Sequence, residues 1–167
     1  GHVAASTGTL PKHDEPGEDM KISSVPNAMV LYNPVLITAE AKGLKTFGGD
    51  RLERLKKRLG VEAPTTLSPY HNIRKGLPSS LVIHGRGDTT VPFLTAQMFV
   101  KQSVKAGLRS ELDGYDDMPH GFFNLGRYDN KMFLATVTRM HEFLKSLGYV
   151  KGKPTVDRFL KRLAKGK

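Results

Sequence analysis

The sequence predicts an α/β fold: a mostly parallel sheet flanked by helices, with three strands inside this chain. Two short segments, 28–36 and 81–84, are almost continuously apolar, as is typical of strands covered on both faces. Helical patterns alternate with the strand segments, which favours parallel strands joined by right-handed crossovers. Three strands alone form a poor parallel sheet, so we expect further strands to lie N-terminal to Gly1.

The first part of the chain is expected to hold one short helix, a surface connection and the first strand. Residues 1–7 are rich in alanine and predict a helical segment. Residues 8–27 are polar and rich in glycine and proline, which indicates a connection that runs over the surface. The strand at 28–36 comes next, with valine and tyrosine among its residues.

Residues 37–79 are mixed in character and are interpreted as a variable insert. Within the insert, residues 50–59 predict a short helix and residues 68–78 predict a loop. One side of that helix would carry Leu52, Leu55 and Leu59. The strand at 81–84 resumes the sheet after the insert.

The pattern after the second strand is helix, strand, helix. A helix is expected from Pro92 to Ala106, because proline suits the first helical turn and Gly107 provides a C-terminal stop. Residues 111–115 predict the third strand, and residues 130–147 predict a strongly amphipathic helix. The apolar positions of this helix are Phe133, Val137, Met140, Phe143, Leu144 and Leu147.

A basic C-terminal helix is expected at about 154–165, and it repeats the amphipathic pattern more weakly. Its apolar positions are Val156, Phe159, Leu160 and Leu163. Residues 151–167 hold seven Lys and Arg against one Asp, a net charge of +6 out of +10 for the whole chain. The excess charge therefore belongs mostly to the tail, and a nucleic-acid-binding face on the body is not expected.

Composition excludes several classes of site. The chain has 167 residues, of which 38% are hydrophobic and 25% charged, as in an ordinary globular protein, and no apolar run approaches the ~18 residues that span a membrane. The absence of cysteine excludes disulfides, a thiolate nucleophile and Cys-ligated zinc. The histidines show no metal-binding spacing, and no phosphate-binding or dinucleotide-binding motif occurs, so neither a metal nor a cofactor is predicted.

Two strand-then-loop segments carry the candidate catalytic residues. Ser80–Pro92 predicts a buried strand that ends near Asp88, and Ser110–Phe123 predicts a strand followed by a loop with His120. The carboxyl ends of parallel strands meet at one edge of a sheet, where functional groups gather. Asp88 alone could be a helix cap and His120 alone a solvated loop histidine, but together they supply the acid and the base of a Ser-His-Asp triad.

Several segments resemble the C-terminal half of α/β-hydrolase serine esterases, in particular the acetyl-esterase and hormone-sensitive-lipase-like group. These segments are NAMVLYNPVL, LSPYHNIRKGLPSSLVIHGRGDTTVPF and MPHGFFN. The opening GHVAAS resembles the segment just after the nucleophilic serine in the elbow motif of that group, Gly-x-Ser-Ala-Gly-Gly-His. The resemblance implies that residues 1–167 are the C-terminal portion of one α/β-hydrolase domain, that Asp88 is its acid and that His120 is its base.

The resemblance also implies that the nucleophile lies about three positions before Gly1, with the oxyanion donors upstream as well. Ser6 has the Ser-x-Gly spacing but lacks a preceding glycine and strand, so it is expected late in the helix after the elbow. On this interpretation the 167 residues alone would be inactive.

The function implied is that of a serine carboxylesterase that acts on small-molecule or carbohydrate esters of short acyl groups, acetyl-carbohydrates being one candidate. Two alternatives stay open. A prolyl-oligopeptidase-like serine peptidase carries similar Asp and His motifs, and a non-catalytic binding module could use the basic tail.

Overall fold

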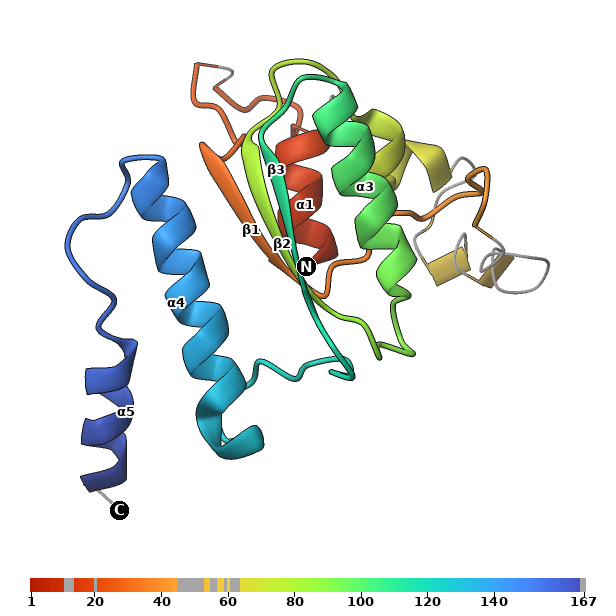
Figure 1. Ribbon diagram of the computed structural model, residues 1–167. Helices are drawn as coiled ribbons and strands as arrows, with labels where there is room; N and C mark the ends of the chain where they lie inside the picture. Colours follow the sequence, from red (N-terminus) through yellow and green to blue (C-terminus); the bar gives the residue numbers. More distant parts are fainter. Residues whose placement is uncertain are drawn as a thin grey trace.

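The three predicted strands form one parallel sheet in the order β1-β2-β3 (Figure 1). This computed structural model describes residues 1–10, 14–19, 21–44, 53–54, 57–58, 60 and 64–165. The strands are β1 (Ala28–Tyr32), β2 (Ser79–Gly85) and β3 (Ser110–Tyr115). The α/β fold class predicted from the sequence is confirmed.

The register of the sheet brings the strand ends together. Tyr32 pairs with Ile83 at the end of β1, and Gly85 pairs with Tyr115 at the end of β3. The backbone N–H of Asn33 donates to the carbonyl of Ile83 at 2.9 Å, which extends the ladder by one residue. The residues after all three strands therefore emerge at the same edge.

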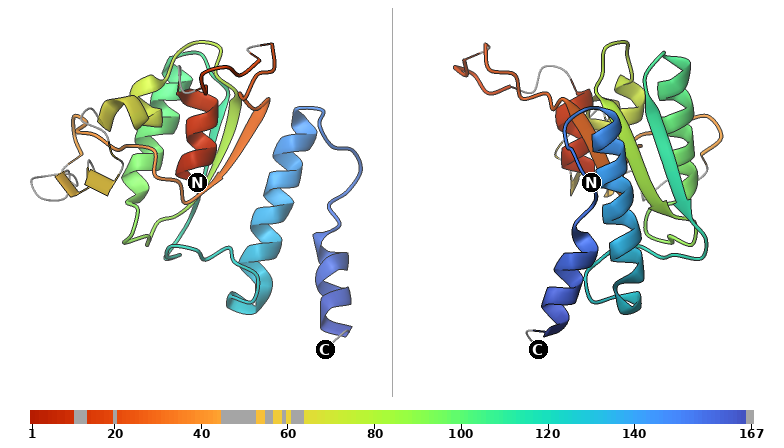
Figure 2. Two further views of the ribbon diagram at one scale, coloured as in Figure 1. Left: turned by 180° about the vertical axis from the view of Figure 1, so that it is seen from behind. Right: turned by 60° about the vertical axis from the view of Figure 1, so that its left-hand side comes forward.

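Helices cover both faces of the sheet (Figures 1 and 2). Helices α1 (His2–Thr9) and α3 (Phe93–Lys105) lie on one face, and α4 (Lys131–Ser146) lies on the other. Helix α5 (Val156–Lys165) packs against α4 on the side away from the sheet. Among the described residues, no helix combines the length and apolarity needed to cross a bilayer.

Alternate residues of the strands fill two separate cores, which explains why the strand segments are apolar throughout. The core under α1 and α3 consists of Ala5, Met29, Leu31, Leu36, Ile37, Val82, Ala96 and Phe99. The core under α4 consists of Leu81, Ile83, Phe122 and Phe143. Each of these residues is at most 4% exposed, so the sheet is rigidly held from both sides.

Some boundaries differ from the sequence prediction. Strand β1 ends at Tyr32 instead of continuing to residue 36, because Asn33 turns the chain with a positive φ of 40° and Pro34 comes next. The predicted loop at 68–78 contains one turn of 3-10 helix at Pro69–Asn72, and a second turn, Pro64–Leu67, precedes it. Of the helix expected at 50–59, the apolar positions Leu52, Leu55 and Leu59 lie outside the described residues.

Candidate active site

Two glycines let the loops after β2 and β3 approach closely. A Cβ atom at Gly85 would overlap the carbonyl oxygen of Met118, and one at Gly87 would lie 3.1 Å from the backbone of Asp117. The backbone of the first loop therefore rests directly against that of the second, an approach that larger residues would prevent. This contact places the residues after Gly87 beside those after Met118.

Asp88 and His120 meet at this junction, as the sequence predicted. Oδ2 of Asp88 lies 2.8 Å from Nδ1 of His120, which is hydrogen-bonding distance. The Asp88 side chain is fully buried, whereas the His120 side chain is 44% exposed. Because Nδ1 faces the carboxylate, Nε2 is the ring nitrogen that can exchange a proton with a group outside the pair.

The second carboxylate oxygen of Asp88, Oδ1, binds backbone groups of the loop that carries Asp88. Oδ1 accepts hydrogen bonds from the backbone N–H groups of Thr90 at 2.8 Å and Val91 at 2.9 Å. On sequence grounds Asp88 alone could have been a helix cap, but helix α3 begins at Phe93 with Pro92 as its N-cap. The two hydrogen bonds to Oδ1 therefore cap the loop and not the helix, while Oδ2 contacts His120. The cap fixes the orientation of the carboxylate, so that Oδ2 points to the histidine.

Asn33, which was not predicted from the sequence, is the third member of this group. Its Nδ2 donates to Oδ2 of Asp88 at 2.8 Å, and its side chain is buried. The signal in the sequence was a single amide within an apolar run, immediately before Pro34 and at the end of a strand. Its partner Asp88 lies 55 positions away, which is why local reasoning did not connect the two.

His84 packs beneath the pair and is not exposed at all. Its Nε2 lies 2.9 Å from the carbonyl oxygen of Val91 and 3.4 Å from Oδ2 of Asp88. Burial lowers the pKa of His84 despite the opposing contributions of the Val91 carbonyl and the Asp88 carboxylate. His84 is therefore a neutral packing residue and places no buried positive charge beside Asp88.

The loop around His120 is held by its own contacts. Gly121 has a φ of +72°, a conformation that glycine adopts without strain. Nη1 of Arg127 donates to the carbonyl oxygens of His120 and Gly121, each at 3.2 Å. The nearby Asp116 is 85% exposed and pairs with Arg86 at 2.8 Å, so it is solvated and takes no part in the contact between Asp88 and His120.

The N-terminus of α1 lies at the same edge of the sheet. A Cβ at Gly1 would lie 2.7 Å from Cα of Pro34 and 3.1 Å from the carbonyl oxygen of Tyr32, so Gly1 sits tightly on the end of β1. These two contacts flank Asn33, the residue that binds Asp88. The chain therefore enters α1 from the edge that carries the Asp88–His120 pair.

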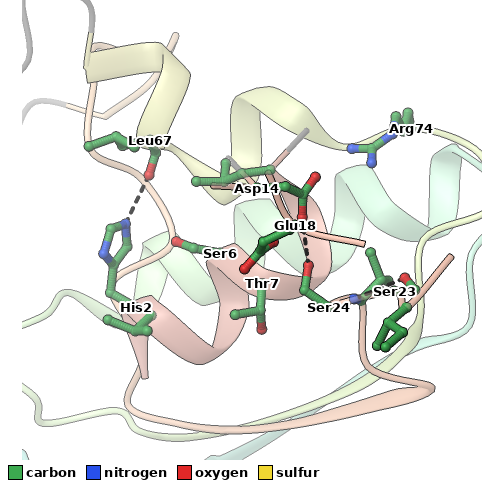
Figure 3. A pocket seen from close by; sticks show the side chains of 13 residues that line it. His2, Ser6, Thr7, Asp14, Glu18, Ser23, Ser24, Leu67 and Arg74 are labelled. Atoms are coloured by element: carbon green, nitrogen blue, oxygen red, sulfur yellow. Dashed lines mark hydrogen bonds between the residues drawn. The ribbon is translucent and has the colours of Figure 1, made fainter. Parts of the chain in front are cut away.

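Ser6 lies within α1 and lines a different cavity. That cavity has a volume of about 490 Å³ and is also lined by His2, Asp14, Glu18 and Arg74, whereas Asp88 and His120 do not line it (Figure 3). Oγ of Ser6 has no hydrogen-bond partner among the described residues. Within those residues there is also no group of three His, Asp or Glu side chains that could hold a metal ion.

The fold of this chain is similar to that of one esterase, for which several structures are known. The native form of esterase 2 from the planctomycete Thermogutta terrifontis matches with a TM-score of 0.81 and 46% identity, over 91% of this chain and 53% of that one. Its propionate-bound form matches with a TM-score of 0.80 and 44% identity, over 92% and 54%. The form phosphonylated by sarin gives a TM-score of 0.83 and 45% identity, over 91% and 55%.

This chain has the α/β-hydrolase fold of these esterases. It spans about half the length of the esterase structures that it matches, and its three strands correspond to the C-terminal part of their fold. No protein-family model and no curated protein sequence matches the chain.

Proposed function

We propose that this α/β-hydrolase chain provides the acid and the base of a serine carboxylesterase, with Asp88 as the acid and His120 as the base. The observation that carries the proposal is the fully buried carboxylate of Asp88 at 2.8 Å from Nδ1 of a half-exposed histidine. The nucleophilic serine would come from residues that precede Gly1. The position of Gly1 beside Tyr32 and Pro34 supports this, because it directs the preceding residues to the same edge.

The chemistry results from the orientation of the imidazole. With the Nδ1 proton donated to Asp88, Nε2 of His120 holds a lone pair and can remove the proton of the serine hydroxyl as its oxygen attacks the ester carbonyl. The tetrahedral intermediate collapses, the alcohol leaves with the proton from Nε2, and an acyl-serine remains. In the second half of the reaction, Nε2 removes a proton from water as the water oxygen attacks the acyl-serine. Nε2 then returns that proton to the serine oxygen, and the carboxylic acid leaves.

The proposed substrate is an ester of a short acyl group. The propionate-bound form of the Thermogutta terrifontis esterase supports this, since propionate is the acid that a propionyl ester releases. Its phosphonylation by sarin supports a nucleophilic mechanism, since the phosphorus of such compounds is attacked as an acyl carbon is. Acetyl esters of carbohydrates are one candidate within this class.

The similarity to esterases also weighs against the two alternatives. A peptidase of the prolyl-oligopeptidase type would share the Asp–His geometry, but the matched structures with 44–46% identity are of an esterase. A binding module that uses the tail would give no reason for a buried carboxylate against a half-exposed histidine.

The proposal is tested with the chain extended N-terminally to the length of the matched esterases, with p-nitrophenyl acetate as substrate. We expect His120→Ala to lower kcat by about 10⁴-fold or more, and Asp88→Asn by roughly 10³- to 10⁴-fold, because triad members act as a unit. Matched controls are His141→Ala on α4 and Asp117→Asn, an exposed carboxylate in the neighbouring loop. Wild-type rates in both His120→Ala and Asp88→Asn would contradict the proposal.

A further inference from the structure

We infer that Asn33 is a positioning residue for the Asp88–His120 pair, because its side-chain amide holds the carboxylate oxygen that receives the His120 proton. The effect on rate rests on the proposed esterase function. The contact between Asn33 and Asp88, and its consequence for the tautomer of His120, do not depend on that function.

Two donors converge on one oxygen. Nδ2 of Asn33 and Nδ1 of His120 each lie 2.8 Å from Oδ2 of Asp88. The two nitrogens are 3.5 Å apart, and since both point a proton at Oδ2, this approach joins two donors that share an acceptor. Oδ1 is held from the other side by the N–H groups of Thr90 and Val91. The amide of Asn33 therefore completes the set of partners around a carboxylate that has no access to water.

The orientation of the amide is fixed by a second contact. The backbone N–H of Gly85 donates to Oδ1 of Asn33 at 3.3 Å. If the amide were turned over, its oxygen would face the Asp88 carboxylate and its NH₂ group would face the Gly85 N–H, so both contacts would become repulsive. Asn33 thus connects the end of β1 to the end of β2 and to the acid of the pair in a single arrangement.

The backbone at this position suits asparagine. Asn33 has a φ of 40°, in the left-handed region, where asparagine, aspartate and glycine occur more readily than other residues. Of these three, aspartate keeps the acceptor for Gly85 and loses the donor for Asp88, and glycine loses both. Both substitutions therefore remove the donor to Asp88 without a conflict in the backbone, and only glycine also removes the acceptor for Gly85.

The role of the amide is to keep His120 in one tautomer. Proton abstraction needs the lone pair on Nε2, and therefore the proton on Nδ1, which Asp88 secures only while Oδ2 stays directed at the ring. Without the Asn33 donor, the carboxylate can rotate about its capped oxygen, and the half-exposed imidazole can turn with it. Nε2 would then carry the proton for part of the time and could not accept one from the serine.

The kinetic test uses the N-terminally extended protein with Asn33→Gly and Asn33→Asp, and with Asn72→Gly as the control. Asn72 also makes two hydrogen bonds through its side-chain amide, to Thr65 and Ser68, and lies away from the pair. We expect Asn33→Gly to lower kcat on p-nitrophenyl acetate about 10- to 100-fold with little change in KM, as for the loss of a hydrogen bond to a charged group. Asn33→Asp should lower kcat at least as much. The decrease should become larger as the pH rises, because the carboxyl group introduced at position 33 ionises beside Asp88. Asn72→Gly should leave kcat unchanged.

A spectroscopic readout decides the contact independently of activity. A histidine Nδ1 proton that is held by a buried carboxylate gives a far-downfield proton resonance, which His120→Ala identifies by its loss. We expect this resonance to broaden or disappear in Asn33→Gly and Asn33→Asp and to persist in Asn72→Gly. If it persists in both Asn33 variants, or if Asn33→Asp keeps the wild-type kcat, the inference is wrong. A wild-type protein without esterase activity would contradict the proposed function and leave the resonance to decide the role of Asn33.

Discussion

The edge of the sheet that carries Asp88 and the C-terminal helix α5 are built in opposite ways. Asp88 is surrounded by side chains and backbone groups from the ends of all three strands, and its side chain is fully buried. In α5, Val156 is 7% exposed, but Phe159 is 42% and Leu163 is 38% exposed. The fold therefore holds the atoms around Asp88 in fixed positions, whereas α5 only covers part of the outer surface of α4.

The electrostatics of the two regions differ as well. The sheet edge holds one buried carboxylate, whose neighbour His84 stays neutral because burial lowers its pKa. The segment from 151 to 167 carries a net charge of +6, and apart from Asp157 its charges are all positive. Burial makes the first region sensitive to the loss of a single contact, whereas water screens the charges of the second.

Gly85→Ala should give the larger effect on the sheet edge. The new Cβ would overlap the carbonyl of Met118, so the two loops must separate, and we expect the free energy of unfolding to fall by about 1–3 kcal/mol and kcat to fall with it. Gly8→Ala is the control, because its Cβ would also approach an atom too closely, but that atom is the sulfur of the unbranched Met29 side chain and not backbone, so we expect a smaller loss of stability and no loss of kcat. Urea denaturation of the extended protein measures the free energy of unfolding, and hydrolysis of p-nitrophenyl acetate measures kcat. A stable and fully active Gly85→Ala would show that the loop approach does not position the pair.

Removal of residues 154–167 should give the smaller effect. Helix α5 contacts α4, with the rings of Phe133 and Phe159 6.3 Å apart, and it lies away from the sheet (Figure 1). We expect the free energy of unfolding to fall modestly, by about 1–2 kcal/mol for the partly exposed apolar face, and kcat on p-nitrophenyl acetate to stay nearly unchanged. If the deletion variant is folded but loses activity on this small ester, the tail contributes to the active site and does not merely cover α4.

The same deletion also tests the binding-module alternative. If the tail recruits an acidic polymer, the full-length protein should bind that polymer in a salt-sensitive manner, and the deletion variant should not. The His120→Ala variant should bind it as the wild type does.

Sequence reasoning succeeded where the physical signal was local. The apolar runs predicted β1, β2 and the parallel sheet, because strands buried on both faces need such runs. The positions of Asp88 and His120 after neighbouring strands predicted their contact, because parallel strands end at one edge. The end of β1 was placed too late, although Asn33-Pro34 is a typical turn dipeptide.

Sequence reasoning failed where the signal was not local. The role of Asn33 depends on Asp88 and Gly85, which are more than fifty positions away in the chain. Likewise, the close approach of Gly85 to Met118 cannot be inferred from either segment alone. Both features arise from the packing of two loops, which only the folded sheet brings together.

Covalent labelling of the N-terminally extended protein with a fluorophosphonate, followed by mass spectrometry of the labelled peptide, tests the central claim most directly. We predict a single labelled serine N-terminal to Gly1, with labelling abolished in His120→Ala and unaffected in His141→Ala. A label on Ser6 or on another serine of this chain, or labelling that does not depend on His120, would contradict the claim.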